Sequence, residues 1–188
     1  MRNLALLSML VACLLFSSCA AVLVAGAGAG AAVAEDRRSV GTITEDESIE
    51  LKTVDRVTAK VPDSVHLNAT SYNRTVLLTG EVPNDKIRAT IERIARSVEN
   101  VRGVTNELTI GPPTSLSSRA NDSYITSKVK ARFVDAQRFN ALHVKVVTEN
   151  QVVFLLGLVK REEAKEAIQV ARTTEGVKKV VTVFEYLD

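Results

Sequence analysis

The feature that most constrains the fold is an internal repeat. An unbroken apolar run that ends in Gly-x-Val spans residues 76–82 and returns at residues 153–159. In each copy an apolar residue and an Ala-Arg pair follow, and then a second apolar alternation. A pattern that repeats together with its flanks indicates two copies of one supersecondary unit. We therefore expect two small domains of the same fold, over residues 46–110 and 122–188.

Both copies predict the same order of elements, namely helix, strand, strand, helix, strand. Apolar residues recur with helical spacing in four stretches and as strand-like runs or alternations between them. The expected helices contain residues 49–57, 87–98, 125–133 and 164–171, and the expected strands contain 65–70, 75–79, 104–110, 142–146 and 152–156, with a last strand after Gly176. This order predicts an α+β fold, αββαβ, occurring twice.

Two equivalent residues mark the end of the second helix in each copy. Asn100 in the first copy aligns with Gly176 in the second. Asn and Gly are the residue types that best tolerate the left-handed conformation found just past a helix. The alignment therefore supports both helix ends at once.

Size and composition favour two small globular domains. Each copy has about 65 residues, near the lower limit for a stable domain, so we expect the copies to pack on each other or to have closely filled cores. The segment 111–121, which opens with Gly-Pro-Pro, is the expected linker. The chain is 46% hydrophobic and 24% charged, with a net charge of +2. Acidic residues interrupt the basic ones throughout, which excludes the clustered basic surface of a nucleic-acid-binding domain.

The amino-terminal segment has the pattern of a secretory signal. Arg2 precedes a short apolar stretch and then the small residues Ser17 and Ser18. With the following Cys19 this resembles a bacterial lipobox, apart from Phe16, which stands where Leu is usual. The resemblance implies removal of a signal peptide at 1–18 and acylation of Cys19, and Ala20 after the Cys implies sorting to the outer membrane.

An uncleaved membrane anchor is the alternative for this segment. Residues 3–34 carry no charge, which is long enough to span a bilayer. However, residues 25–32 are only Ala and Gly, which drive insertion weakly. We therefore expect a lipidated Cys19 followed by a flexible tether up to residue 45.

Candidate catalytic and metal-binding residues are few. His66 and His143 are the two histidines, and they occupy equivalent positions in the repeats. Each falls on the polar side of its strand, with no Cys or second His nearby to complete a coordination set. We expect both to face solvent. No nucleophile elbow, phosphate-binding glycine loop or zinc motif is present, so we expect no enzyme activity, no cofactor and no metal.

The expected first helix of the second copy carries a distinctive surface. Its apolar line comprises Ile125, Val129 and Phe133, and a flanking line comprises Tyr124, Lys128 and Arg132. An aromatic residue with a polar tip and two long cations beside an apolar line suits a lipid headgroup interface. Residues 122–139 carry four bases and two acids, whereas residues 45–61 of the first copy carry three bases and five acids. The alternative is that these charges simply solvate an amphipathic helix.

The repeated motifs resemble a known domain. The Gly-x-Val and Val-x-x-Val motifs of both copies are similar to those of BON domains, most specifically at residues 121–129 and 146–159. With the lipobox and the small-residue tether, the whole chain resembles the dual-BON outer-membrane lipoproteins. The resemblance implies a three-stranded mixed sheet with two helices on one face in each domain. It also implies no catalysis, and binding of anionic phospholipid by the first helix of the second domain.

These inferences lead to one expected function and one alternative. We expect a monomeric lipoprotein of the outer membrane, facing the periplasm, whose second BON domain binds anionic phospholipid and supports outer-membrane integrity. The predicted lipid-binding residues are Tyr124, Ile125, Lys128, Val129, Arg132 and Phe133. The alternative is a protein-interaction module, in which an exposed sheet edge or the first domain binds an envelope assembly or cell-wall partner.

Overall fold

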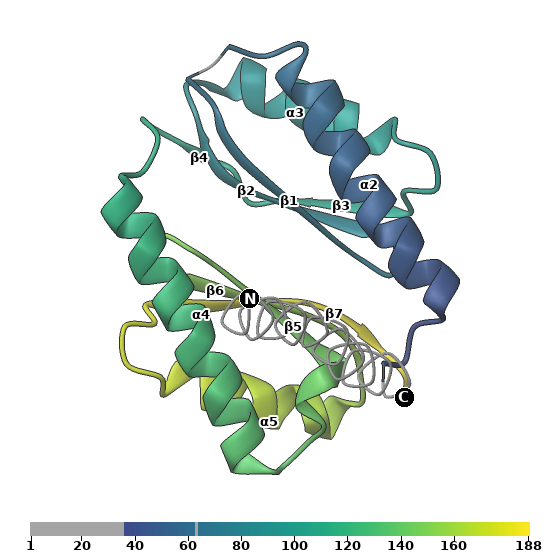
Figure 1. Ribbon diagram of the computed structural model, residues 1–188, viewed down its shortest axis with the longest axis vertical. Coiled ribbons are helices and arrows are strands. Elements are labelled where there is room, and N and C mark those ends of the chain that lie inside the picture. The colour runs from purple at the N-terminus through teal and green to yellow at the C-terminus, as the bar shows by residue number, and fades with distance from the viewer. Residues whose placement is uncertain (1–35, 63) are drawn as a thin grey trace, which may run out of the picture. The chain divides into compact units, whose positions relative to one another are not determined.

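In the computed structural model, each copy of the repeat folds into two helices and a sheet (Figure 1). The structure describes residues 36–62 and 64–188. The first domain comprises α2 (Val40–Thr58), β1 (His66–Tyr72), β2 (Thr75–Val82), α3 (Asp85–Arg96), β3 (Gly103–Asn106) and β4 (Thr109–Ile110). The second comprises α4 (Leu116–Ala136), the short 3-10 helix η1 (Ala141–His143), β5 (Val144–Glu149), β6 (Val152–Val159), α5 (Arg161–Arg172) and β7 (Lys179–Tyr186). The predicted α+β class and the αββαβ order are confirmed.

The two sheets have the same mixed topology. The strand orders are β1-β2-β3 and β5-β6-β7, and the short β4 also pairs with β2. The first two strands of each sheet are antiparallel, and the third runs parallel to the central strand. Val76 pairs with Val104 in the first sheet as Val153 pairs with Val180 in the second. The internal repeat therefore extends to the register of the strands.

Each domain buries an apolar core between its helices and one face of its sheet. In Figure 1, α2 and α3 cover one face of the first sheet, and α4 and α5 cover one face of the second. Residues on the central strands alternate between this face and the other. Val76 and Leu78 belong to the core beneath α2 and α3, whereas Leu77 between them belongs to a third cluster.

The third cluster lies between the two sheets. It contains Tyr72 and Leu77 from the first domain and Phe154, Leu156 and Leu158 from the second. Because both faces of β2 and β6 are buried, these strands read as unbroken apolar runs rather than as alternations. Of the two alternatives expected for domains this small, packing on each other or closely filled cores, the structure shows the first.

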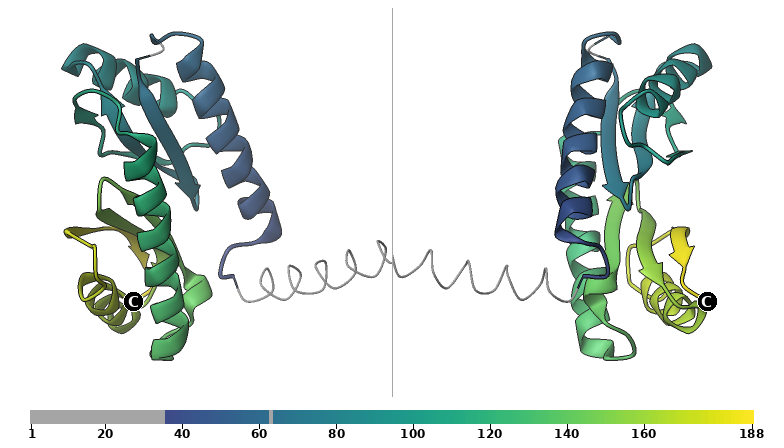
Figure 2. Two further views of the ribbon diagram at one scale, coloured as in Figure 1. Left: turned by 60° about the vertical axis from the view of Figure 1, so that its left-hand side comes forward. Right: turned by 90° about the vertical axis from the view of Figure 1, so that its right-hand side faces the viewer.

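The first helix of each domain begins earlier than the apolar periodicity predicts. The tether was expected to extend to residue 45 and the linker to residue 121, but α2 begins at Val40 and α4 at Leu116. Ser39 and Ser115 act as N-caps, and each accepts a hydrogen bond from the backbone N–H three residues later. The early turns contribute little to the core, so the apolar spacing gives no signal there. In the left-hand view of Figure 2 the first turns of α4 reach the level of the first sheet.

Equivalent glycines allow close approach of two strands in each sheet. A Cβ atom on Gly80 would lie 2.1 Å from the carbonyl oxygen of His66, and one on Gly157 would lie 2.5 Å from that of His143. The expected left-handed residues are also confirmed, with φ of 66° at Asn100 and 91° at Gly176. However, α3 and α5 end at Arg96 and Arg172, so these residues close a short turn beyond each helix.

Candidate functional site

Helix α4 contributes three of the predicted lipid-binding residues to the core of the second domain. Ile125 and Phe133 are each 1% exposed, and Val129 is fully buried. They pack with β-strand residues such as Val146 and Leu155 and with α5. In this fold they attach α4 to its sheet, and they do not face the solvent.

Arg132, another of the predicted lipid-binding residues, forms hydrogen bonds at the carboxyl end of α5. Its guanidinium donates hydrogen bonds to the Thr174 Oγ1 at 2.9 Å, the Thr173 Oγ1 at 3.1 Å and the Val170 carbonyl at 3.3 Å. Carbonyls in the last turn of a helix have no partner within the helix and carry partial negative charge. Arg132 therefore stabilises the carboxyl end of α5.

Lys128 is paired but accessible. Its ammonium lies 2.8 Å from the Glu175 carboxylate and 5.2 Å from the ring centroid of Tyr124. The hydrogen bond from Lys128 lowers the pKa of the Glu175 carboxyl. Glu175 is almost fully exposed, and a pair of this kind is weak because water screens both charges. Lys128 can exchange Glu175 for another anion at little cost.

The solvent-facing strip of α4 lies opposite its buried line. At about 100° per residue, Tyr124, Ser127, Ala131 and Val134 share one side of the helix, and all are exposed. Tyr124 and Val134 are each 63% exposed. The adjacent Lys130 is exposed and has no hydrogen-bond or ion-pair partner within residues 36–62 and 64–188. We call Tyr124, Ser127, Lys130, Ala131 and Val134 the outer strip.

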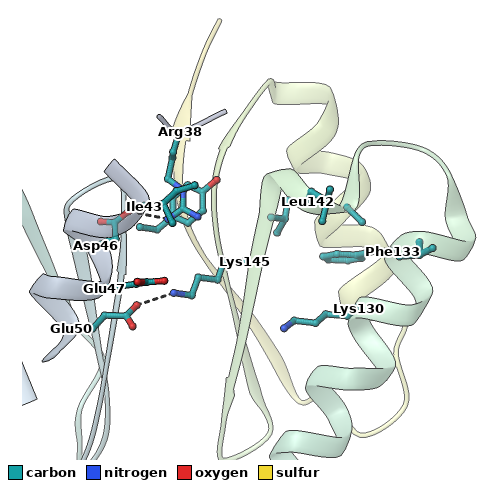
Figure 3. Close-up of a pocket in the computed structure, with 13 residues that line it drawn as sticks. Arg38, Ile43, Asp46, Glu47, Glu50, Lys130, Phe133, Leu142 and Lys145 are labelled. Atoms are coloured by element: carbon teal, nitrogen blue, oxygen red, sulfur yellow. Dashed lines mark hydrogen bonds and ion pairs between the residues drawn. The ribbon is translucent and has the colours of Figure 1, made fainter. Parts of the chain in front are cut away.

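A cavity of about 450 Å³ adjoins the outer strip (Figure 3). Val134, Phe133 and Leu142 line it from the second domain, and Ile43 lines it from α2. Figure 3 shows the Lys130 side chain extending from α4 toward this space. Leu142 is 48% exposed, so the apolar surface continues from Val134 to the mouth of the cavity. Its volume lies within the range of about 300–1,000 Å³ typical of small-molecule sites.

Charges from both domains surround the same cavity. Lys145 lies 2.8 Å from Glu50, the pair that Figure 3 marks with a dashed line, and Arg38 lies 2.9 Å from Asp46. The Lys145–Glu50 pair joins β5 to α2, and the Arg38–Asp46 pair joins the residues just before α2 to α2 itself. Lys130 therefore differs from the other two cations of the cavity, which have acidic partners.

The two histidines do not face solvent, which corrects the prediction. Each side chain is only 13% exposed. The Nδ1 of His66 lies 2.9 Å from the Glu81 carboxylate, and the Nδ1 of His143 lies 3.5 Å from that of Glu163. Hydrogen bonds from Arg37 hold the pKa of Glu163 at about 2. The polar side of β1 and the start of β5 face other parts of the two domains, so alternation alone could not distinguish solvent from an interface.

The expected lipidation site, Cys19, lies outside the described residues, as do the expected signal peptide and most of the tether. Within residues 36–62 and 64–188, no helix is both long enough and apolar enough to cross a membrane.

Comparison with known proteins identifies the repeated domain. The BON domain model matches residues 46–112 and again 121–188. The chain belongs to the BON-domain family. The predicted resemblance is thereby confirmed for both copies.

Three relatives place these BON domains among bacterial proteins. The chain is 42% identical to the outer membrane lipoprotein DolP of Haemophilus influenzae over 94% of this chain and 93% of that protein. It is 32% identical to the 21 kDa hemolysin of Actinobacillus pleuropneumoniae, over 81% and 79% of the two chains. It is 28% identical to the osmotically-inducible protein Y of Escherichia coli, over 81% and 78%.

Sequence reasoning missed Lys130 and Val134. It selected the cations that flank the apolar line, and those positions lie close enough to the core for their side chains to reach α5 and Glu175. The residues opposite the apolar line are the exposed ones, and their position could be read from the helical period alone.

Proposed function

We propose that this BON protein is an outer-membrane lipoprotein that faces the periplasm and docks its second domain on anionic phospholipid. The 42% identity to a protein named outer membrane lipoprotein DolP supports the location. The lipobox-like segment ending in Cys19 supports the anchor. Through this contact the protein would support outer-membrane integrity.

The outer strip of α4 is the observation that carries the lipid proposal. Tyr124 and Val134 are each 63% exposed on a helix whose apolar line, Ile125, Val129 and Phe133, is buried. Lys130 lies between them in the sequence and is free to contact a phosphate. An amphipathic helix with aromatic and aliphatic side chains beside a cation suits the headgroup boundary of a bilayer.

The free energies of membrane binding contributed by the anchor and by the outer strip indicate different roles for the two. A lysine near an anionic surface contributes about 1 kcal/mol, so Lys130 and Lys128 together contribute only a few kcal/mol at most. Acyl chains contribute about 0.8 kcal/mol for each buried methylene, which is far more in total. The anchor would hold the protein on a membrane, and α4 would select anionic regions of it.

Vesicle flotation tests the lipid proposal. The protein used is residues 36–188, because removing the first domain would expose Phe154 and Leu156. Wild-type protein is expected to float with phosphatidylglycerol vesicles at low salt and to detach as salt screens the charges. Replacing Tyr124 with Ala and Lys130 with Glu together is expected to reduce flotation at least about tenfold, the factor that 1.4 kcal/mol corresponds to.

Lys86→Glu is the matched control for this experiment. Lys86 is exposed on α3 of the first domain, so the variant has the same change of charge at a distant helix. It should float as the wild type does. Equal loss in both variants would show that only net charge matters, and no loss in the α4 variant would refute the proposal.

Mass spectrometry of the protein isolated from membranes tests the anchor. The expected mature chain begins at Cys19 and carries acyl chains on that residue. A mature chain that retains residues 1–18 would instead support the uncleaved anchor.

A protein-interaction module is the second candidate function. β7 is an edge strand of eight residues, and Tyr186 and Leu187 at its end are 44% and 52% exposed. A free strand edge can pair with an extended segment of another protein. Crosslinking from Leu187 to an envelope protein, without flotation on vesicles, would favour this function.

A further inference from the structure

Three metal-ligating side chains converge where the two domains meet. His66 begins β1, Glu81 lies opposite it on β2, and Glu149 ends β5 of the second domain. One ligand atom from each lies within 4.8 Å of those from the other two. The carboxylates are almost fully buried, with Glu81 4% and Glu149 7% exposed. We call these three residues the bridging cluster.

The spacing of the bridging cluster fits one small cation. Two ligands at about 2.1 Å from a tetrahedral zinc ion lie about 3.4 Å from each other. The Nδ1 of His66 is 2.9 Å from Glu81 Oε2 and 3.9 Å from Glu149 Oε1. These two distances lie on either side of the ideal value, and the ligand oxygens of Glu81 and Glu149, which lie within 4.8 Å of each other, would have to approach by up to about 1.4 Å to share one ion.

Neighbouring groups already orient both carboxylates. The Asn68 amide donates to Glu149 Oε2 at 2.7 Å, and the backbone N–H of Thr114 donates to Glu81 Oε2 at 3.0 Å. Partners of this kind fix the ligands of protein metal sites. The other carboxylate oxygen of Glu81 is buried and has no hydrogen-bond partner among the described residues. This free oxygen, Oε1, is available for a cation, whereas Oε2 already accepts hydrogen bonds from Thr114.

Charge and access also favour a dication. Glu81 and Glu149 place two carboxylates in a nearly buried position, where a charged group requires a partner of opposite charge or a metal ion. Arg119 lines a recess of about 530 Å³ beside His66 and Glu149, but its guanidinium donates to the Thr114 carbonyl. The recess provides an entry path and space for a water molecule as the fourth ligand.

We propose that His66, Glu81 and Glu149 bind a divalent transition metal, with Zn²⁺ as the reference ion, and that this ion links the two BON domains. Two ligands come from the first sheet and one from the second. Metal binding therefore stabilises the arrangement in which β1 and β5 face each other.

Zinc titration of the full chain tests the proposal. The protein is prepared in detergent without a polyhistidine tag and is treated with EDTA. Calorimetry is expected to show one saturable Zn²⁺ site per chain and an increase in the midpoint of thermal unfolding. His66→Gln and Glu149→Gln are each expected to weaken binding at least about tenfold.

His143→Gln is the matched control, because His143 has the equivalent position and the same exposure but lies near one carboxylate that Arg37 already binds. It should leave zinc affinity unchanged. Because the chain has two histidines, the imidazole that remains in this variant belongs to His66, and its NMR signals are thereby assigned. Zn²⁺ should shift the ring nitrogens of His66 in the wild type and leave those of His143 in place.

The NMR measurement decides the question even if a variant fails to fold. Absence of saturable binding, or a zinc-induced shift at His143 instead of His66, would overturn the proposal. Equal affinity in the wild type and in folded Glu149→Gln would overturn the link between the domains.

Discussion

At the scale of single residues, two buried aspartates connect the first helix of each domain to its hairpin. Asp46 accepts hydrogen bonds from the backbone N–H groups of Asn73 and Arg74. Asp122 accepts the equivalent bonds at 2.9 and 2.8 Å from the turn between β5 and β6. All four turn residues have positive φ, which is the geometry of a tight two-residue hairpin. Each aspartate thus satisfies two N–H groups that point inward from a strained turn.

Replacing Asp122 with Ala is predicted to destabilise the protein. The change removes the acceptor of the part-buried N–H groups of Asn150 and Gln151, at a cost of about 1–3 kcal/mol each. Urea denaturation should therefore show a free energy of unfolding lower by about 2–6 kcal/mol. Asp135→Ala, on an exposed position of the same helix, should change it by less than about 0.5 kcal/mol. Similar losses in both variants would show that the hairpin does not depend on Asp122.

At the scale of elements, α4 has two sides with different tasks. Its buried line and Arg132 hold the second domain together, whereas the outer strip is exposed. The predicted lipid-binding set combined residues from both sides, because it contained the buried line together with Tyr124, Lys128 and Arg132. In the structure the two sides are distinct, because the long side chain of Arg132 reaches the end of α5.

Replacing Arg132 with Gln tests this separation. The loss of hydrogen bonds to the last turn of α5 is predicted to lower the free energy of unfolding by about 1–2 kcal/mol. Vesicle flotation of the folded variant should remain close to that of the wild type. Arg138→Gln is the control, because Arg138 forms a more exposed pair with Glu166. Loss of flotation without loss of stability would instead place the Arg132 guanidinium on the lipid.

At the scale of the whole molecule, the cluster between the sheets makes the two domains interdependent. Leu77 and Leu156 are fully buried in it, and Phe154 is 3% exposed. A domain of this size has little apolar surface to bury by itself. The shared cluster gives each domain a second buried face.

Replacing Leu156 with Asp is predicted to separate the domains. A carboxylate among apolar side chains without a partner is strongly unfavourable, so the sheets should no longer pack. Calorimetry should show one unfolding transition for the wild type and two, at lower temperatures, for the variant. Leu187→Asp, at an exposed position, serves as the control. A single unchanged transition in Leu156→Asp would contradict the dependence of one domain on the other.

Much of the fold could be predicted because the repeat supplies two independent readings of one pattern. The order of elements, the left-handed Asn100 and Gly176, and the BON resemblance all follow from residues close together in the sequence. The helix starts at Val40 and Leu116 were missed because the first turns carry no apolar period. Asp46 lies within α2 and binds the hairpin, a contact between distant residues that no local pattern records.

The sequence by itself determined the class of fold, the two copies and the amphipathic character of α4, because local apolar spacing encodes all three. Only the tertiary structure decided which polar side chains meet solvent. His66 and Glu149 are 83 positions apart in the chain, and they lie 3.9 Å from each other only because the two sheets pack face to face. Contacts of this kind depend on how separate elements stack, and no periodicity within one element records that.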